Sequence, residues 1–242
     1  MIQQLVEIPL PDGKVSYSLL NRADSDDFVI FLHSLASHTA RTLPYLFAYH
    51  LQAHGFNVLR LGQYDHRDHG RKLVDCTMAI HAQDLNTAIS YVHTTYNPKR
   101  IHVVGHSFGG PTILLAKPKA ISAILLDPSH PSRNPFRDAR YIKELDLYVK
   151  SSSGLDYHIG PAMVKEAESW NHTDLTAGYS LPTLIISAGA SPLMEVAPAY
   201  LAGLQADVKQ TIIEGADHTF SAPVFINPLL HECVAWLKDH RL

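Results

Sequence analysis

The chain has 242 residues, of which 46% are hydrophobic and 18% charged, and its formal net charge is −3. This length suits one large domain or two small ones with a sizeable buried core. The nearly balanced charge gives none of the basic surface typical of proteins that bind nucleic acid or acidic membranes. Two cysteines, Cys76 and Cys233, are too few for a disulfide framework, and we interpret both as free thiols.

The N-terminal residues 1–7 lack the basic segment and the long apolar run of a signal peptide. No apolar stretch reaches the roughly 18 residues that a membrane-spanning helix needs. We therefore expect a cytoplasmic protein with no membrane partner. The sixteen histidines are a high count, which we interpret as composition rather than as a metal site.

Short apolar runs alternate with longer amphipathic segments along the chain. Residues 2–8 and 14–20 flank the turn signal Pro11-Asp12-Gly13 and predict a hairpin. Further strands are predicted over 28–32, 57–61, 101–104, 121–126, 183–187 and 208–213, and helices over 39–54, 77–96, 108–116, 194–206 and 223–240. This alternation with short connections predicts an α/β fold, with a mostly parallel central sheet and helices on both faces.

Residues 128–180 break the alternation, because they separate two predicted strands without containing one. An amphipathic run over 136–149 and a second over 159–170 favour two helices. A connection of this length is usually functional or an inserted element. We therefore expect a single domain over 1–242 with a small helical cap, inserted at about 128–180, over the C-terminal edge of the sheet.

A candidate nucleophile lies in the turn Gly105-His106-Ser107-Phe108-Gly109, between a predicted strand and a predicted helix. A serine hydroxyl is a weak nucleophile and needs a base within hydrogen-bond reach, which a third group must orient. A sharp strand-to-helix turn projects the serine outward, and flanking glycines allow tight backbone packing. The alternative is an ordinary glycine-rich turn. We interpret Ser107 as the nucleophile of a serine hydrolase.

Four motifs together make the chain similar to the α/β-hydrolase family over nearly its whole length. They are residues 32–34 after the third strand, 65–70 after the fourth, the turn around Ser107, and 215–220 after the last strand. The resemblance implies an α/β-hydrolase fold with its cap after the sixth strand, and a reaction that requires no metal and no organic cofactor. In this family the stretch with Asp65, His66 and His69 is a structural turn, so we do not interpret it as a metal site.

The resemblance implies that the base is His218, in the loop after the last strand. Two other histidines are alternatives. His106 adjoins Ser107, and side chains of neighbouring residues on a tight turn diverge. His102 lies within a predicted strand, where a packed core residue is expected.

The acidic partner of the base is open to two interpretations. Many relatives have an aspartate shortly after the seventh strand, where this chain has Ser191. Asp127 at the end of the strand over 121–126 and Glu195 at a helix start are the candidates. We favour Asp127, because a longer side chain on a helix start loses more rotamer freedom when it holds a histidine.

The oxyanion hole is expected to use backbone N–H groups. One is that of Phe108, directly after the nucleophile. The resemblance implies that the second is that of Leu35, in the loop after the third strand, where Ser34 replaces the usual glycine. Four aromatic residues of the insertion either line an acyl pocket or pack within the cap: Tyr141, Tyr148, Tyr157 and Trp170.

These residues predict hydrolysis of a carboxylic ester, or a related acyl bond, in a small-molecule substrate through an acyl-enzyme on Ser107. Fold does not fix function, and amide or thioester hydrolysis, acyl transfer and cofactor-free haloperoxidase activity use the same residues. A non-catalytic receptor for a small ligand is the alternative from a different class. The absence of an aspartate at Ser191 favours the receptor, whereas Ser107 and His218 favour the enzyme.

Overall fold

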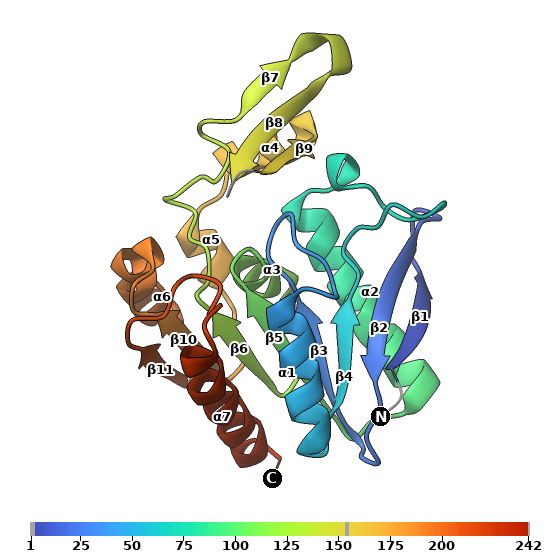
Figure 1. Ribbon diagram of the computed structural model, residues 1–242, viewed down its shortest axis with the longest axis vertical. Helices are drawn as coiled ribbons and strands as arrows, with labels where there is room; N and C mark the ends of the chain where they lie inside the picture. The colour runs from blue at the N-terminus through green and yellow to red at the C-terminus, as the bar shows by residue number, and fades with distance from the viewer. Residues whose placement is uncertain (1–2, 153–154, 242) are drawn as a thin grey trace.

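The computed structural model describes residues 3–152 and 155–241 (Figure 1). Eight strands form one sheet in the order β1-β2-β4-β3-β5-β6-β10-β11. Only the pairs β1–β2 and β2–β4 are antiparallel, and all other neighbours are parallel. The bounds are β1 Gln3–Pro9, β2 Val15–Asn21, β3 Asp27–Leu32, β4 Asn57–Leu61, β5 Arg100–His106, β6 Ser122–Leu126, β10 Thr183–Ala188 and β11 Val208–Ile213. The mostly parallel sheet is as predicted.

Helices cover both faces of this sheet because the side chains of each strand alternate between two cores. Along β3, Val29 and Phe31 pack with α1 and α7, whereas Phe28, Ile30 and Leu32 join the core on the other face. Helices α2, α3, α5 and α6 contribute to that second core. The bounds are α1 Thr42–Ala53, α2 Met78–Tyr96, α3 Gly109–Ala116, α5 His172–Thr176, α6 Ala197–Gly203 and α7 Pro223–Asp239.

Two helix ends illustrate how local sequence sets these bounds. Helix α2 begins after Thr77, whose side chain accepts a hydrogen bond from the Ile80 N–H at 3.1 Å. The helix predicted over 194–206 is instead a 3₁₀ turn, η3 Pro192–Val196, followed by α6. Pro198 explains the interruption, since proline fits only the first turn of a helix.

The insertion over 128–180 is helical only in part. The helix expected over 136–149 is wrong, because this stretch forms β7 Arg140–Ile142, the 3₁₀ turn η2 Lys143–Leu145 and the start of β8 Leu147–Ser152. With β9 Leu155–Ile159 these make a three-stranded antiparallel sheet, and α4 Pro161–Glu168 follows. Asp146, with a φ of 48°, turns the chain. Tyr141 and Tyr148 then pair across the strands with ring centroids 4.9 Å apart.

The insertion is anchored to the body of the protein at several points. The Glu166 carboxylate accepts hydrogen bonds from the N–H groups of Met78 (2.6 Å) and Ala79 (3.1 Å) at the start of α2. Gly160 lies so close to the 3₁₀ turn η1 Leu73–Asp75 that a Cβ there would be 1.9 Å from the Val74 carbonyl oxygen. The cap therefore rests on fixed contacts above the sheet (Figure 1).

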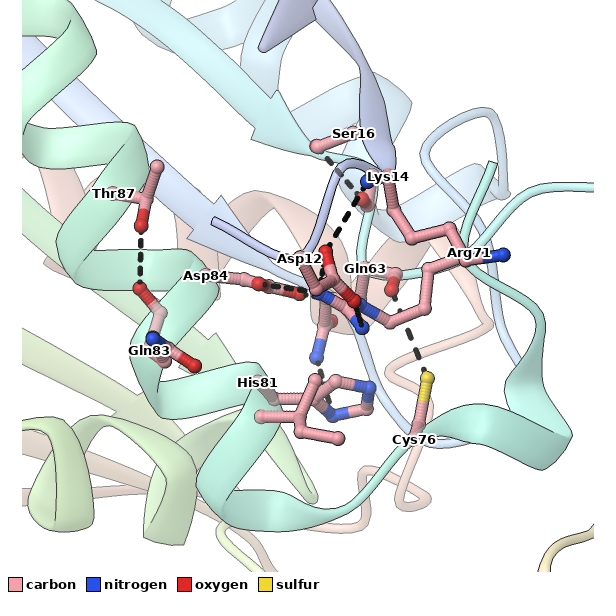
Figure 2. A network of polar contacts seen from close by, with 12 residues as sticks. Asp12, Lys14, Ser16, Gln63, Arg71, Cys76, His81, Gln83, Asp84 and Thr87 are labelled. Atoms are coloured by element: carbon pink, nitrogen blue, oxygen red, sulfur yellow. Dashed lines mark hydrogen bonds and ion pairs between the residues drawn. The ribbon is translucent and has the colours of Figure 1, made fainter. Parts of the chain in front are cut away.

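An ion-pair network centred on the buried Arg71 holds the β1–β2 hairpin against the body (Figure 2). The Arg71 guanidinium, after β4, donates to both carboxylate oxygens of Asp84 on α2 at 2.9 and 3.0 Å, and to Asp12 in the hairpin turn at 2.7 Å. Burial raises the pKa of Asp84 to about 6, although Arg71 opposes the shift. One turn earlier on α2, His81 presents its ring edge-on to Phe108, so this network borders the turn that carries Ser107.

Candidate active site

Ser107 stands on a turn that only a glycine-flanked sequence can form. Its φ is 55°, in the left-handed region that is costly for a residue with a side chain. A Cβ on Gly105 would lie 2.4 Å from the Gly109 backbone, and one on Gly109 would lie 2.8 Å from the Leu32 carbonyl oxygen. Both glycines are therefore required for the approach of α3 to β5 and β3, as expected for a nucleophile elbow.

Ser107, His218 and Asp127 form a continuous chain of hydrogen bonds. His218 Nε2 lies 2.8 Å from Ser107 Oγ, and His218 Nδ1 lies 2.5 Å from Asp127 Oδ2. The serine and the carboxylate are buried, whereas the histidine side chain is 34% exposed. The three side chains thus have the geometry of a Ser–His–Asp triad, with Asp127 in the position of the acid.

Asp127 is held firmly at the end of β6. Its backbone N–H donates to the Ile186 carbonyl oxygen at 2.7 Å, and its Oδ1 accepts from the Ala188 N–H at 3.2 Å. Its other carboxylate oxygen is the one that meets His218. Because both oxygens have donors, the carboxylate is satisfied in a site that water hardly reaches.

The other two acid positions considered from the sequence lie away from His218. Glu195 forms an ion pair with Arg133 at the surface, where the Glu195 side chain is 75% exposed. Ser191 accepts a hydrogen bond from the Leu193 N–H at 3.2 Å and so caps η3. The structure therefore brings Asp127, and neither of these residues, to the histidine.

The other two histidines considered as the base, His106 and His102, have structural roles. His106 Nε2 donates to the His218 carbonyl oxygen at 2.8 Å, and burial lowers the pKa of His106 to about 4, which keeps it neutral. It thereby supports the loop of His218, a role that the sequence pattern did not reveal. His102 lies inside β5, with Nδ1 2.8 Å from Ser122 Oγ.

The two backbone N–H groups expected to bind an oxyanion lie directly after Ser107 and in the loop after β3. Those of Phe108 and Leu35 donate to no protein acceptor in the part of the chain that the structure describes. The Ser34 carbonyl oxygen accepts from the Ser37 N–H at 3.1 Å and from His33 Nδ1 at 2.9 Å, which closes the loop after β3. A serine in place of glycine is therefore compatible with this turn.

A model of the alpha/beta hydrolase family matches residues 29–230. The chain belongs to the alpha/beta hydrolase family. No curated protein matches its sequence significantly.

Solved structures confirm the α/β-hydrolase fold across nearly the whole chain. Est1E from Butyrivibrio proteoclasticus has a TM-score of 0.81 at 17% identity, with 98% of each chain covered. The esterase domain of a Rhodothermus marinus protein has a TM-score of 0.78 at 17% identity, with 99% of each chain covered. A dienelactone hydrolase from Anabaena variabilis has a TM-score of 0.74 at 15% identity, with 98% of this chain and 97% of its own chain covered. At such identities the likeness shows the fold.

Two cavities of this α/β hydrolase flank the loop after β3. The larger, about 750 Å³, lies between that loop, the loop after β4, the face of β1 and β2, and strand β9 of the cap. The smaller, about 290 Å³, is lined by Leu35, His106 and Thr219, which neighbour the triad. The larger cavity contains no triad residue, and the two share Ala36 and Ser37 as walls.

Residues 3–152 and 155–241 contain no group of three or more histidine, cysteine, aspartate or glutamate side chains arranged to hold a metal ion. Asp65, from the stretch considered for metal binding, accepts the Arg67 N–H at 2.9 Å and so shapes its own turn. No helix among the same residues is long and apolar enough to cross a membrane.

Proposed function

We propose that this α/β hydrolase is a serine hydrolase that cleaves a carboxylic ester or a related acyl bond through an acyl-enzyme on Ser107. The observation that carries the proposal is the unbroken chain of hydrogen bonds from Ser107 Oγ through His218 to the buried Asp127. In this arrangement the histidine can accept the serine proton while the carboxylate stabilises the resulting imidazolium.

The reaction begins when Ser107 Oγ attacks the substrate carbonyl carbon and its proton passes to His218 Nε2. The carbonyl oxygen becomes an oxyanion, for which the Phe108 and Leu35 N–H groups are the donors. His218 then gives the proton to the leaving alcohol as the C–O bond breaks, which leaves the acyl group on Ser107. Water attacks next, with His218 again taking a proton and returning it to Ser107.

A small-molecule substrate fits the cavities on both sides of the loop with Leu35. Small-molecule sites typically occupy about 300–1,000 Å³, and the larger cavity has about 750 Å³. Its lining combines tyrosines and apolar side chains with charged side chains such as Arg67 and Lys72. The tyrosines are Tyr17, Tyr64 and Tyr157. Because Tyr157 belongs to the cap, the insertion takes part in substrate selection under this proposal.

The alternative of a non-catalytic receptor rested on the serine at position 191. Asp127 supplies the carboxylate that this argument required, so the contact between Asp127 and His218 supports the enzyme. Two structural neighbours are named esterases, which agrees with the same reaction class.

The test is labelling with a fluorophosphonate, which reacts with activated serines, combined with hydrolysis of p-nitrophenyl esters of increasing chain length. The wild type is expected to be labelled and active. Ser107→Ala should lose the label and lower kcat by about 10⁴-fold or more, without a change in Tm. Ser132→Ala is a matched control. The Ser132 hydroxyl contacts His130 Nδ1 at 2.8 Å, so this variant should leave both the labelling and kcat unchanged.

Retained labelling and near-wild-type turnover in Ser107→Ala would remove Ser107 from the mechanism. Thioester and amide substrates, and an alcohol offered as acyl acceptor, separate ester hydrolysis from the related acyl reactions. A wild type that binds small esters without any turnover or labelling would favour the receptor.

A further inference from the structure

Ser107 has a second hydroxyl neighbour besides the histidine. Ser129 Oγ lies 3.1 Å from Ser107 Oγ. The Ser129 N–H also donates to the Ser107 carbonyl oxygen at 3.0 Å. The two serines are thus joined through both main chain and side chain, although they are 22 positions apart in the sequence.

The direction of the hydroxyl contact follows from the state of His218. Because the Asp127 carboxylate accepts a hydrogen bond from Nδ1, the neutral imidazole carries its proton there, and Nε2 is an acceptor. Ser107 has one hydroxyl proton, which it donates to Nε2. In the contact between the serines, Ser129 is therefore the donor and Ser107 Oγ the acceptor.

The backbone of Ser129 is fixed from two sides. Its carbonyl oxygen accepts a hydrogen bond from the hydroxyl of Tyr200, a fully buried side chain whose ring meets that of His130 edge-on at 5.2 Å. The preceding Pro128 presses on the elbow, since a Cβ on Gly110 would lie 2.6 Å from the Pro128 Cβ. A donor held in place beforehand loses little conformational entropy when it binds a developing charge.

We propose that Ser129 is a catalytic residue, whose hydroxyl donates to Ser107 Oγ and stabilises negative charge on that oxygen in both steps of the reaction. This inference rests on the proposed function. As His218 removes the Ser107 proton, the electron pair of the O–H bond goes to Oγ and then forms the bond to the carbonyl carbon. In deacylation the C–Oγ bond breaks, its electron pair returns to Oγ, and His218 gives the proton back.

Ser129 assists only while Oγ carries charge. In the acyl-enzyme Oγ is an ester oxygen, which is a poor acceptor, so the hydrogen bond weakens there. An interaction that is stronger in the transition states than in the stable states raises kcat rather than lowering KM.

The test is Ser129→Ala, which removes the hydroxyl and keeps the main-chain contacts to Ser107 and Tyr200. Hydrogen bonds to charged groups are stronger than those between neutral groups. We therefore expect kcat for p-nitrophenyl acetate and the second-order rate of fluorophosphonate labelling each to fall about 10- to 100-fold, with KM and Tm unchanged.

Two further variants distinguish the loss of the hydroxyl donor from a purely structural effect. Ser129→Thr retains the donor and should restore both rates to within a few-fold of wild type. Ser132→Ala, three residues further along the same segment, should leave both rates unchanged. If Ser129→Ala keeps wild-type rates while Ser107→Ala is inactive in the same assay, the role of Ser129 is overturned and the proposed function stays intact. A wild type without labelling or turnover would overturn both.

Discussion

The edge of the sheet and the insertion above it are built in different ways. At the sheet edge, Ser107 and Asp127 follow buried strands, and backbone hydrogen bonds from neighbouring strands fix both residues. In the insertion, the small sheet leaves large apolar side chains in solvent: Tyr141, Leu145 and Leu155 are 46%, 65% and 63% exposed. Under the proposed function, the sheet and the residues that directly follow its strands, Ser129 included, carry the chemistry, whereas the more distant part of the insertion shapes what reaches the site.

The acid provides the largest contrast between the sheet edge and the exposed surface. Asp127→Asn keeps the size of the side chain but removes the charge that orients His218, so kcat should fall by at least about 100-fold and by up to about 10⁴-fold. Glu195→Gln disturbs only a surface ion pair and should change kcat less than about 10-fold. Steady-state kinetics on one ester measure both. The reverse ranking would assign the role of the acid to Glu195 at the surface and would contradict the division between the sheet and the insertion.

The contact between the insertion and the elbow provides the next test. The Trp170 ring lies 5.4 Å from that of Phe108, and only about 10 Å³ of free space remains beside them and Ser129. Trp170→Ala should open this space, so that the ratio of kcat/KM for a butyrate ester over an acetate ester rises about 10-fold.

This ratio does not depend on the fraction of folded protein, so a loss of stability cannot imitate the effect of Trp170→Ala. Tyr141→Ala is the control on the exposed side of the insertion, and it should leave the ratio unchanged. An unchanged ratio in Trp170→Ala would show that the insertion does not limit the acyl group.

The anchor at α2 tests how firmly the two regions are joined. Glu166→Gln weakens a charged hydrogen-bond acceptor at the start of α2, and the free energy of unfolding should fall by about 1 kcal/mol. Glu168→Gln, on the same helix and exposed, is the control and should have little effect. Urea denaturation measures both variants, and equal midpoints would mean that the anchor contributes nothing.

The body of the protein should also respond to acid. Burial lowers the pKa of His102 to about 4, whereas a histidine in the unfolded chain has a pKa of about 6.5. Above that pH both states are neutral. Between about pH 6.5 and 4 the unfolded chain binds a proton at this histidine and the folded chain does not. As the pH decreases through this range, the free energy of unfolding therefore decreases by up to about 1.4 kcal/mol per pH unit for one such histidine.

His102→Asn removes this titration. Between pH 7 and 5.5, we therefore expect this variant to lose about 1 kcal/mol less unfolding free energy than the wild type does. Urea denaturation at the two pH values gives the difference, and parallel losses would contradict the assignment. Any fixed cost of the substitution cancels, because only the change with pH is compared.

Local patterns predicted the strands of the large sheet well. The strand over 57–61 has the predicted bounds, and its five consecutive residues are all buried. The strand over 208–213 also has the predicted bounds, although only Ile213 is buried in it. The stretch over 136–149 was misinterpreted, because half-exposed strands with paired tyrosines resemble an amphipathic helix in sequence. The places of Ser129 and His106 depend on partners 22 and 112 positions away, and no local spacing carries that information.

The backbone at two of the proposed catalytic positions has a consequence for how this protein can evolve. Ser107 and Asp127 both hold left-handed conformations, with φ of 55° and 39°, and each costs roughly 1 kcal/mol that a glycine would not incur. Ser107→Gly or Asp127→Gly would thus relieve strain while removing a proposed catalytic group. At Ser107, selection for stability alone would favour the glycine, so the serine reflects a compromise between stability and activity. At Asp127 the hydrogen bond that the carboxylate accepts from the Ala188 N–H offsets the strain, so the same exchange would gain less.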